Sequence, residues 1–326
     1  MSSVLEAVLK LRPSSVASRL SGTCVCLLNA RDIQRSVGLG TVVVAFEVPA
    51  PALAQGIVRA ARQVGAVVGL SFPALQLGES PRSHAVVQSL VAAIEEAGLT
   101  LPIFFRGGPV LLQEASEGAV AQARETVFRL IDAGFTEVSM DASGLDPAEA
   151  AAAIAEAAAP LRERELSLDI TSRLAEPDAV TELVGSLGAQ GVRVDVLTVP
   201  GAALAAVDDL TPLEKAARPA VLSVLDPQRR LRGTGARRAV ASAPFCRILA
   251  SALGAEAREA VRARALQGVP VPAALAATRE AAALDEEAQL RLEALSYHEA
   301  LEILADTGGQ GSGTASLSFL AEKSGY

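Results

Sequence analysis

Short apolar runs alternate with helical segments along most of this chain, and this alternation limits its fold more than any other feature. Each run is rich in Val, Ile, Leu or Phe and ends near Gly, Pro, Ser or Asp, which is typical of a buried β-strand. Eight such runs occur, at residues 41–48, 65–72, 101–108, 137–143, 166–171, 192–199, 220–226 and 245–251.

Seven of the gaps between these runs have the apolar spacing of an amphipathic helix, the last of them a short helix at 236–243. Strands that are apolar throughout and covered by helices indicate a parallel sheet buried on both faces. Eight repeats predict a closed (β/α)8 TIM barrel with helices following it at 254–305. An open doubly wound sheet is the alternative, but no GxGxxG motif follows the first strand.

Composition fits one globular barrel and disfavours nucleic acid as a partner. The 326 residues are 50% hydrophobic and 20% charged, as in folded proteins. The formal net charge of −8 repels phosphate backbones, although arginines cluster locally. The clustered arginines are Arg229, Arg230, Arg232, Arg237 and Arg238.

The three cysteines favour a reducing compartment, so we expect a cytoplasmic protein without a disulfide framework. Cys24 and Cys26 have the spacing of half a metal site, or are an ordinary buried pair. The first residues do not have the pattern of a signal peptide, and no apolar run is long enough to span a membrane.

Three regions follow from this pattern: an extension at 1–22, the barrel with its helices at 23–305, and a tail at 306–326. The tail begins with a Gly/Ser-rich stretch, which predicts a flexible linker. Its GQGSGT segment lacks the GK[ST] of a nucleotide-binding loop. The extension and the Ala-rich helix predicted near 148–160 are candidate docking surfaces.

Four segments, in this order, resemble the class II fructose/tagatose-bisphosphate aldolases. AGFTEVSMDASGLDPAEA (133–150) is the most specific, and its DAS ending is closer to the tagatose-bisphosphate branch. The others are CLLNARDI (26–33), VVVAFEVPAPALAQGIVRAA (42–61) and RRAVASAPFCRILASAL (237–253). The resemblance implies a TIM barrel, a place in carbohydrate metabolism and, if the chain is active, an aldehyde-lyase reaction on a phosphorylated ketose.

The residues with which that family holds zinc are replaced. The family uses three histidines, and this chain has only His84 and His298, neither at a strand end. Where the family's third strand carries a catalytic Asp and a zinc ligand, this chain has Phe105-Arg106-Gly107-Gly108-Pro109. The other two ligand positions fall in 199–202 and 223–227, without histidine. We therefore assign no metal ligand and expect no cofactor, with Mg²⁺ on carboxylates as a weaker alternative.

A lysine Schiff base is also not expected. Such a lysine would have to lie in a barrel strand, where its surroundings lower its pKa. Lys10, Lys215 and Lys323 all lie outside the predicted strands.

The active site of such a barrel lies at the carboxyl ends of its strands, where several polar residues are predicted. Asp141 and Asp169 are candidates for acid–base catalysis, or relics in a structural network. Arg106 is a candidate to bind a phosphate or carboxylate, or to form a salt bridge with Asp141. Ser143 and Ser251 are candidates for binding a ligand or its phosphate group. The remaining strand-end candidates are Glu47, Ser71, Thr171, Arg173 and Asp226.

Two glycine-containing segments are candidate anion sites. Gly107 and Gly108 would let backbone N–H groups approach the anion beside Arg106. Gly233-Thr234-Gly235 precedes the helix predicted at 236–243, where the family binds sugar phosphate, or it is an ordinary loop.

Three functional hypotheses remain. The first is a catalytically degenerate barrel that binds a phosphorylated sugar or similar small anion, or serves as a non-catalytic partner subunit. The second is an active metal-independent aldolase or isomerase in which Arg106 stabilises an enediolate while Asp141 or Asp169 moves the proton. The third is a structural barrel in a larger assembly. In each case we expect a homo-oligomer or a partner subunit.

Overall fold

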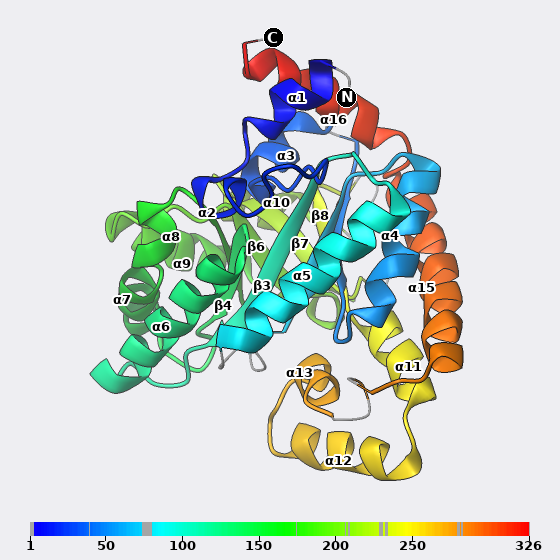
Figure 1. Cartoon of the computed structure of the whole chain (residues 1–326). Coiled ribbons are helices and arrows are strands. Elements are labelled where there is room, and N and C mark those ends of the chain that lie inside the picture. Colours follow the sequence, from blue (N-terminus) through cyan, green and yellow to red (C-terminus); the bar gives the residue numbers. More distant parts are fainter. Residues whose placement is uncertain are drawn as a thin grey trace.

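Eight parallel strands close into one barrel, which confirms the (β/α)8 prediction (Figure 1). The structure, a computed structural model, describes residues 3–38, 40–73, 80–173, 175–205, 207, 209–227, 231, 234–278, 281 and 283–325. Each strand pairs with the next, and β8 pairs with β1. The strands are β1 Val43–Glu47, β2 Val68–Phe72, β3 Ile103–Leu111, β4 Glu137–Asp141, β5 Ser167–Thr171, β6 Val196–Pro200, β7 Val221–Leu225 and β8 Arg238–Ala241.

Helices cover the outside of the barrel and extend beyond both of its ends (Figure 1). They are α1 Ser3–Leu9, α2 Ser14–Ala17, α3 Ala30–Ser36, α4 Ala52–Val64, α5 Ser80–Ala97, α6 Glu117–Ala133, α7 Pro147–Ala157, α8 Ala159–Glu163, α9 Pro177–Ala189, α10 Thr211–Ala217, α11 Ala243–Ala252, α12 Ala255–Leu266, α13 Val271–Ala276, α15 Glu286–Thr307 and α16 Ser312–Lys323, with a 3₁₀ turn at Gly201–Leu204. None of the described helices is long and apolar enough to cross a membrane.

The last strand differs from the prediction. The strand lies at 238–241, inside the segment predicted to be a short helix, and 245–251 is part of α11 instead of a strand. Pro244 stands in the first turn of α11, and Phe245 and Leu249 are buried one helical turn apart. The apolar run at 245–251 thus has helical spacing. The true strand, β8, is short and contains Arg238, which pairs with the buried Glu137.

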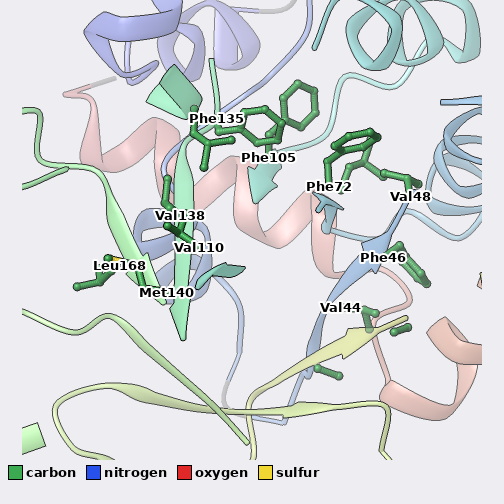
Figure 2. Close-up of a cluster of buried hydrophobic side chains, with 14 of the residues drawn as sticks. Val44, Phe46, Val48, Phe72, Phe105, Val110, Phe135, Val138, Met140 and Leu168 are labelled. Atoms are coloured by element: carbon green, nitrogen blue, oxygen red, sulfur yellow. The ribbon is translucent and has the colours of Figure 1, made fainter. Parts of the chain in front are cut away.

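The strands present two different surfaces. Along β4, Val138 and Met140 belong to the large apolar cluster between the strands and the helices (Figure 2). Their neighbours Glu137 and Ser139 are fully buried and polar. Because successive strand residues point to opposite faces, these polar residues lie inside the barrel. The interior is therefore partly ionic, and the apolar core surrounds it.

The two ends of the chain pack together beyond the amino ends of the strands, at the top of Figure 1. The prediction of a flexible linker in the tail is wrong, because the tail contains the helix α16, which buries Ser316, Leu320 and Ala321. Its start is fixed by the N–H groups of Gly311 and Gly313, which donate to Val64 and Gly65. A side chain at Gly313 would collide with Leu101. The glycines therefore permit close packing of the tail.

Two further contacts concern the predicted docking surfaces. In the extension, α1 packs against α16 and buries Leu5 and Val8. In the Ala-rich helix α7, the buried alanines include Ala150 and Ala153, and α7 contacts both α6 and α9. Within the described chain, both predicted surfaces thus have intramolecular partners.

Long helix α15 lies along α4 on the outside of the barrel (Figure 1). The crossing is close at Gly56, where a Cβ would collide with the backbone of Glu293 and the side chain of Ser296. At the opposite end from the termini, α12 and α13 stand beyond the carboxyl ends of the strands. This end contains the candidate site.

Candidate active site at the barrel mouth

A cavity of about 660 Å³ opens at the carboxyl ends of the strands. Its wall comes from β1, β3 to β7, α11 and α13. Arg106, Asp141, Glu47 and Asp226 line it, as predicted from strand ends, whereas Asp169 does not. The volume lies in the range usual for small-molecule sites.

Arg106 forms the floor of the cavity and is almost completely buried. Its Nε and Nη2 lie 2.8 and 2.7 Å from Oδ2 of Asp169, and its Nη1 donates to Ser71 Oγ at 2.9 Å. The Glu137 carboxylate lies 3.6 Å away. The alternative of a salt bridge to Asp141 is therefore wrong, because the partner of Arg106 is Asp169.

Asp169 is enclosed on both oxygens. Oδ2 accepts from Arg106, and Oδ1 accepts from Thr198 Oγ at 2.8 Å. The residue is fully buried beneath the cavity floor. Its geometry is that of a fixed structural partner, which argues against the predicted role in proton transfer to a ligand.

A second ion pair lies deeper in the barrel. Arg238 donates to both oxygens of Glu137, through Nη1 to Oε2 at 2.6 Å and through Nη2 to Oε1. Its guanidinium also lies 4.4 Å from the ring centroid of Phe104. Burial raises the pKa of Glu137, and the Arg238 charge opposes that rise. Together with Arg106 and Asp169, this pair forms a four-residue network, which we call the ionic core.

The charge of Arg106 is stabilised by its surroundings. Burial alone would lower the pKa of Arg106, but Asp169, Glu47 and Glu137 outweigh burial, and the pKa is raised. The floor of the cavity is thus a permanent cation whose charge is shared among three carboxylates.

Asp141 and Ser143 form a turn after β4. Asp141 Oδ1 accepts the Ser143 N–H at 2.9 Å, and Ser143 Oγ accepts the Arg173 N–H at 3.3 Å. Asp141 is half-buried at the cavity wall, while Gly144 lines the cavity in place of Ser143. These contacts connect the loops after β4 and β5.

The two glycines after Arg106 are required by the close packing around them. A Cβ at Gly107 would collide with Leu130 outside the barrel. Gly108 has φ of +123° and approaches the Ser139 carbonyl so closely that a side chain could not fit. Glycine is required at both places by its neighbours.

The other predicted anion site does not reach the cavity. Gly233 lies outside the described residues, and Thr234 Oγ donates to the Leu231 carbonyl at 2.7 Å. Gly235 is near Glu214, and neither Thr234 nor Gly235 lines the mouth. The segment precedes β8 instead of a helix. Ser251 is exposed on α11, where its hydroxyl donates to Ile248 O.

Glu47 is the carboxyl group with the most unusual surroundings in the mouth. It is 4% exposed, its Oε2 accepts from Ser71 at 3.4 Å, and its Oε1 has no hydrogen-bond partner among the described residues. Burial raises its pKa to about 7; Arg106 and Ser71 oppose this, and Asp226 adds to it. A residue of the cavity lining that has an unpaired carboxylate oxygen and a pKa near neutrality suits proton exchange with a ligand.

This raised pKa predicts how stability depends on pH. Glu47 titrates near 4.5 when unfolded and near 7 when folded, so its contribution to the unfolding free energy decreases between those values. The decrease amounts to at most about 3 kcal/mol. Glu47→Gln should therefore flatten this part of the profile, measured by urea denaturation at about pH 4.5, 6 and 8. A profile that remains as steep as that of the exposed control Glu302→Gln would contradict the assignment.

The sequence prediction missed or misplaced two residues of the mouth and one residue of the ionic core beneath it. Arg247 and Cys246 line the cavity from α11, which was predicted to be a strand. Glu137 was not singled out, although Glu137, Ser139 and Asp141 alternate with apolar residues along one buried strand. That spacing of two is the signal of an interior face. Asp226 caps α11 by accepting the N–H groups of Ser242 and Ala243 at 2.7 and 2.8 Å.

The residues present do not fit the zinc site of the class II aldolases. His84 is on α5 and His298 on α15, both outside the barrel. Among the residues that the structure describes, no group of three or more His, Cys, Asp or Glu side chains could hold a metal ion. Cys24, which is exposed, and Cys26, which is buried, are likewise not part of such a group.

Solved structures share this fold at low sequence identity. The YdjI aldolase from Escherichia coli K12 matches with a TM-score of 0.58 and 16% identity, covering 88% of this chain and 99% of that one. The fructose-bisphosphate aldolase Fba from Campylobacter jejuni matches with a TM-score of 0.57 and 9% identity, covering 87% and 94%. No protein-family model and no curated protein matches the sequence. The resemblance to these aldolases is thus confirmed for the fold.

Proposed function

We propose that this chain binds a phosphorylated sugar or similar small anion at the barrel mouth and does not carry out three-histidine zinc catalysis. The observation that carries the proposal is the open cavity with a buried guanidinium, Arg106, at its floor. Zinc catalysis by the aldolase route would require three histidine ligands, and the sequence has two histidines.

The charges around the opening favour an anion. Arg173 and Arg247 are exposed residues of the cavity lining. Among the opposing carboxylates, Asp141 and Asp226 accept backbone N–H groups, so part of their negative charge is already compensated. Guanidinium groups at the opening suit phosphate or carboxylate, which they can bind through two hydrogen bonds.

The remaining wall suits an organic ligand. Its apolar residues come from two places. Pro270, Val271 and Pro272 lie at the start of α13, and Leu111 and Leu112 lie at the end of β3. Small-molecule sites commonly combine such apolar walls with a few polar groups. The aldolases with the same fold support a ligand of the phosphosugar class.

Binding can be tested by titrating the purified chain with phosphorylated ketoses in a calorimeter. Arg247→Ala should weaken binding by roughly ten- to a hundredfold, as expected for loss of one charge-assisted contact. The matched control is Arg258→Ala, on α12 outside the cavity lining. Stoichiometric zinc together with cleavage of fructose or tagatose bisphosphate would contradict the proposal, as would equal affinities of both variants.

One observation favours a second candidate, an isomerase or lyase without zinc. Glu47 lines the cavity, has an oxygen without a hydrogen-bond partner among the described residues, and has a pKa of about 7, whereas both oxygens of Asp169 accept hydrogen bonds. Glu47 would take a proton from the carbon next to the ligand carbonyl, and the Arg106 charge would stabilise the enediolate. Glu47 thus replaces Asp141 and Asp169 as the preferred base.

The second candidate is tested by turnover of the same ketoses. Glu47→Gln should lower kcat by at least about a hundredfold with little change in binding. If turnover is unchanged in Glu47→Gln, or is absent from the unaltered protein, the isomerase or lyase candidate is rejected. The proposed binding function would not be affected by either result.

A further inference from the structure

We propose a second anion site at the opposite end of the barrel, which binds the phosphate group of a small phosphorylated molecule. A cavity of about 630 Å³ opens there, between α3, α8, the segment before β6 and the end of α16. Its wall carries six cations: Arg31, Arg35, Arg162, Arg164, Arg193 and Lys323.

The wall has an excess of positive charge. Among the described residues of the lining, three carboxylates, Asp32, Glu165 and Asp195, oppose the six cations, which leaves a formal charge of 6 − 3 = +3. The whole chain has a formal charge of −8. A cavity whose wall concentrates cations in this way attracts a multiply charged anion, even though the protein as a whole is acidic.

One buried carboxylate holds several of the guanidinium groups. Asp195 Oδ1 lies 3.1 Å from Arg193 Nε and 3.8 Å from Arg31 Nε. Arg35 also acts on this carboxyl group electrostatically. One negative charge among three positive ones leaves two uncompensated, which is the charge of a phosphate monoester.

The other cations have weak or no acidic partners. Arg162 donates to the Ala155 carbonyl at 3.1 Å, and Arg164 contacts Glu163 in a pair exposed to solvent. Among the described residues, no carboxylate lies within 4.0 Å of Arg35 or Arg162. Neither of these two guanidinium groups is thus held in an ion pair with a described residue, and Arg can bind phosphate through two parallel hydrogen bonds.

The site is preorganised by backbone contacts on its inner side. Arg31 Nη2 and Asn29 Nδ2 donate to the Glu165 carbonyl at 2.6 and 2.7 Å. Lys323, from the end of α16, pairs with Asp32 at 2.6 Å. The chain terminus that folds back on the barrel thus completes the cavity wall.

The test is calorimetric titration of the full chain with inorganic pyrophosphate at low ionic strength. The double variant Arg35→Ala/Arg162→Ala should weaken binding by roughly tenfold or more. The matched control Arg258→Ala/Arg262→Ala removes the same charge from α12 and should have little effect. Asp32→Asn removes a carboxylate from the wall and should tighten binding severalfold.

Three outcomes would overturn the proposal: no binding of pyrophosphate, equal losses in the two double variants, or loss in Arg247→Ala with none in Arg35→Ala/Arg162→Ala. The last would place pyrophosphate at the barrel mouth. Thermal unfolding of each variant separates loss of the site from loss of the fold.

Discussion

Glu137→Gln should lower the free energy of unfolding by about 3–5 kcal/mol. Glu137 is fully buried and holds both ends of the Arg238 guanidinium. The amide keeps the shape of the side chain but removes its charge, so Arg238 is left as a buried cation without its anion. Urea denaturation monitored by circular dichroism measures the difference.

The matched control is Glu125→Gln, the same substitution in an exposed ion pair. Glu125 and Arg129 lie 2.9 Å apart on the surface of α6, so this change should cost less than about 1 kcal/mol. The pair of substitutions Glu137→Leu/Arg238→Met should recover much of the loss, because it removes both buried charges. Equal effects of the two Glu→Gln variants would show that the ionic core does not hold the barrel together.

Arg106→Met should also destabilise the protein by about 3–5 kcal/mol near pH 8, and less at acidic pH. Without the guanidinium, Asp169 loses its ion-pair partner, and Glu47 loses a positive charge that opposes the rise of its pKa. The folded-state pKa of Glu47 then rises further above its unfolded value. The contribution of Glu47 to stability is therefore present where it is protonated and is lost as the pH rises.

Denaturation at about pH 5 and pH 8 tests this, with Arg129→Met as the control on the surface of α6. The control should lose less than about 1 kcal/mol at both pH values. A loss in Arg106→Met that is the same at both pH values would contradict the proposed compensation of buried carboxylates. Ligand titration of this variant at acidic pH, where it is folded, should also show weaker binding at the mouth.

Most of the barrel followed from local sequence pattern. The predicted strands overlap β1 to β7, because each is a short segment with apolar residues that is bounded by turn residues. The eighth strand was misassigned because its four residues include an arginine, which is unfavourable in a buried strand unless a partner is present. That partner, Glu137, lies four strands away in the chain order.

The candidate site was predicted in part. Strand ends pointed to Arg106, Asp141, Glu47 and Asp226, all of which line the mouth. The pairing of Arg106 with Asp169 was not predictable, because β3 and β5 are not neighbours in the sheet. Their side chains meet only across the closed interior, at a height set by strand register and tilt.

The sequence by itself determined the repeating strand and helix pattern, the aldolase resemblance and the absence of three histidines. These depend on composition and on spacing within short segments, where side-chain periodicity directly reflects the local backbone. Only the tertiary structure decided which charges meet, which carboxyl group is left with a free oxygen, and that the Gly/Ser-rich tail packs as a helix. Those features depend on barrel closure and burial, which bring distant residues together and remove the water that would otherwise separate their charges.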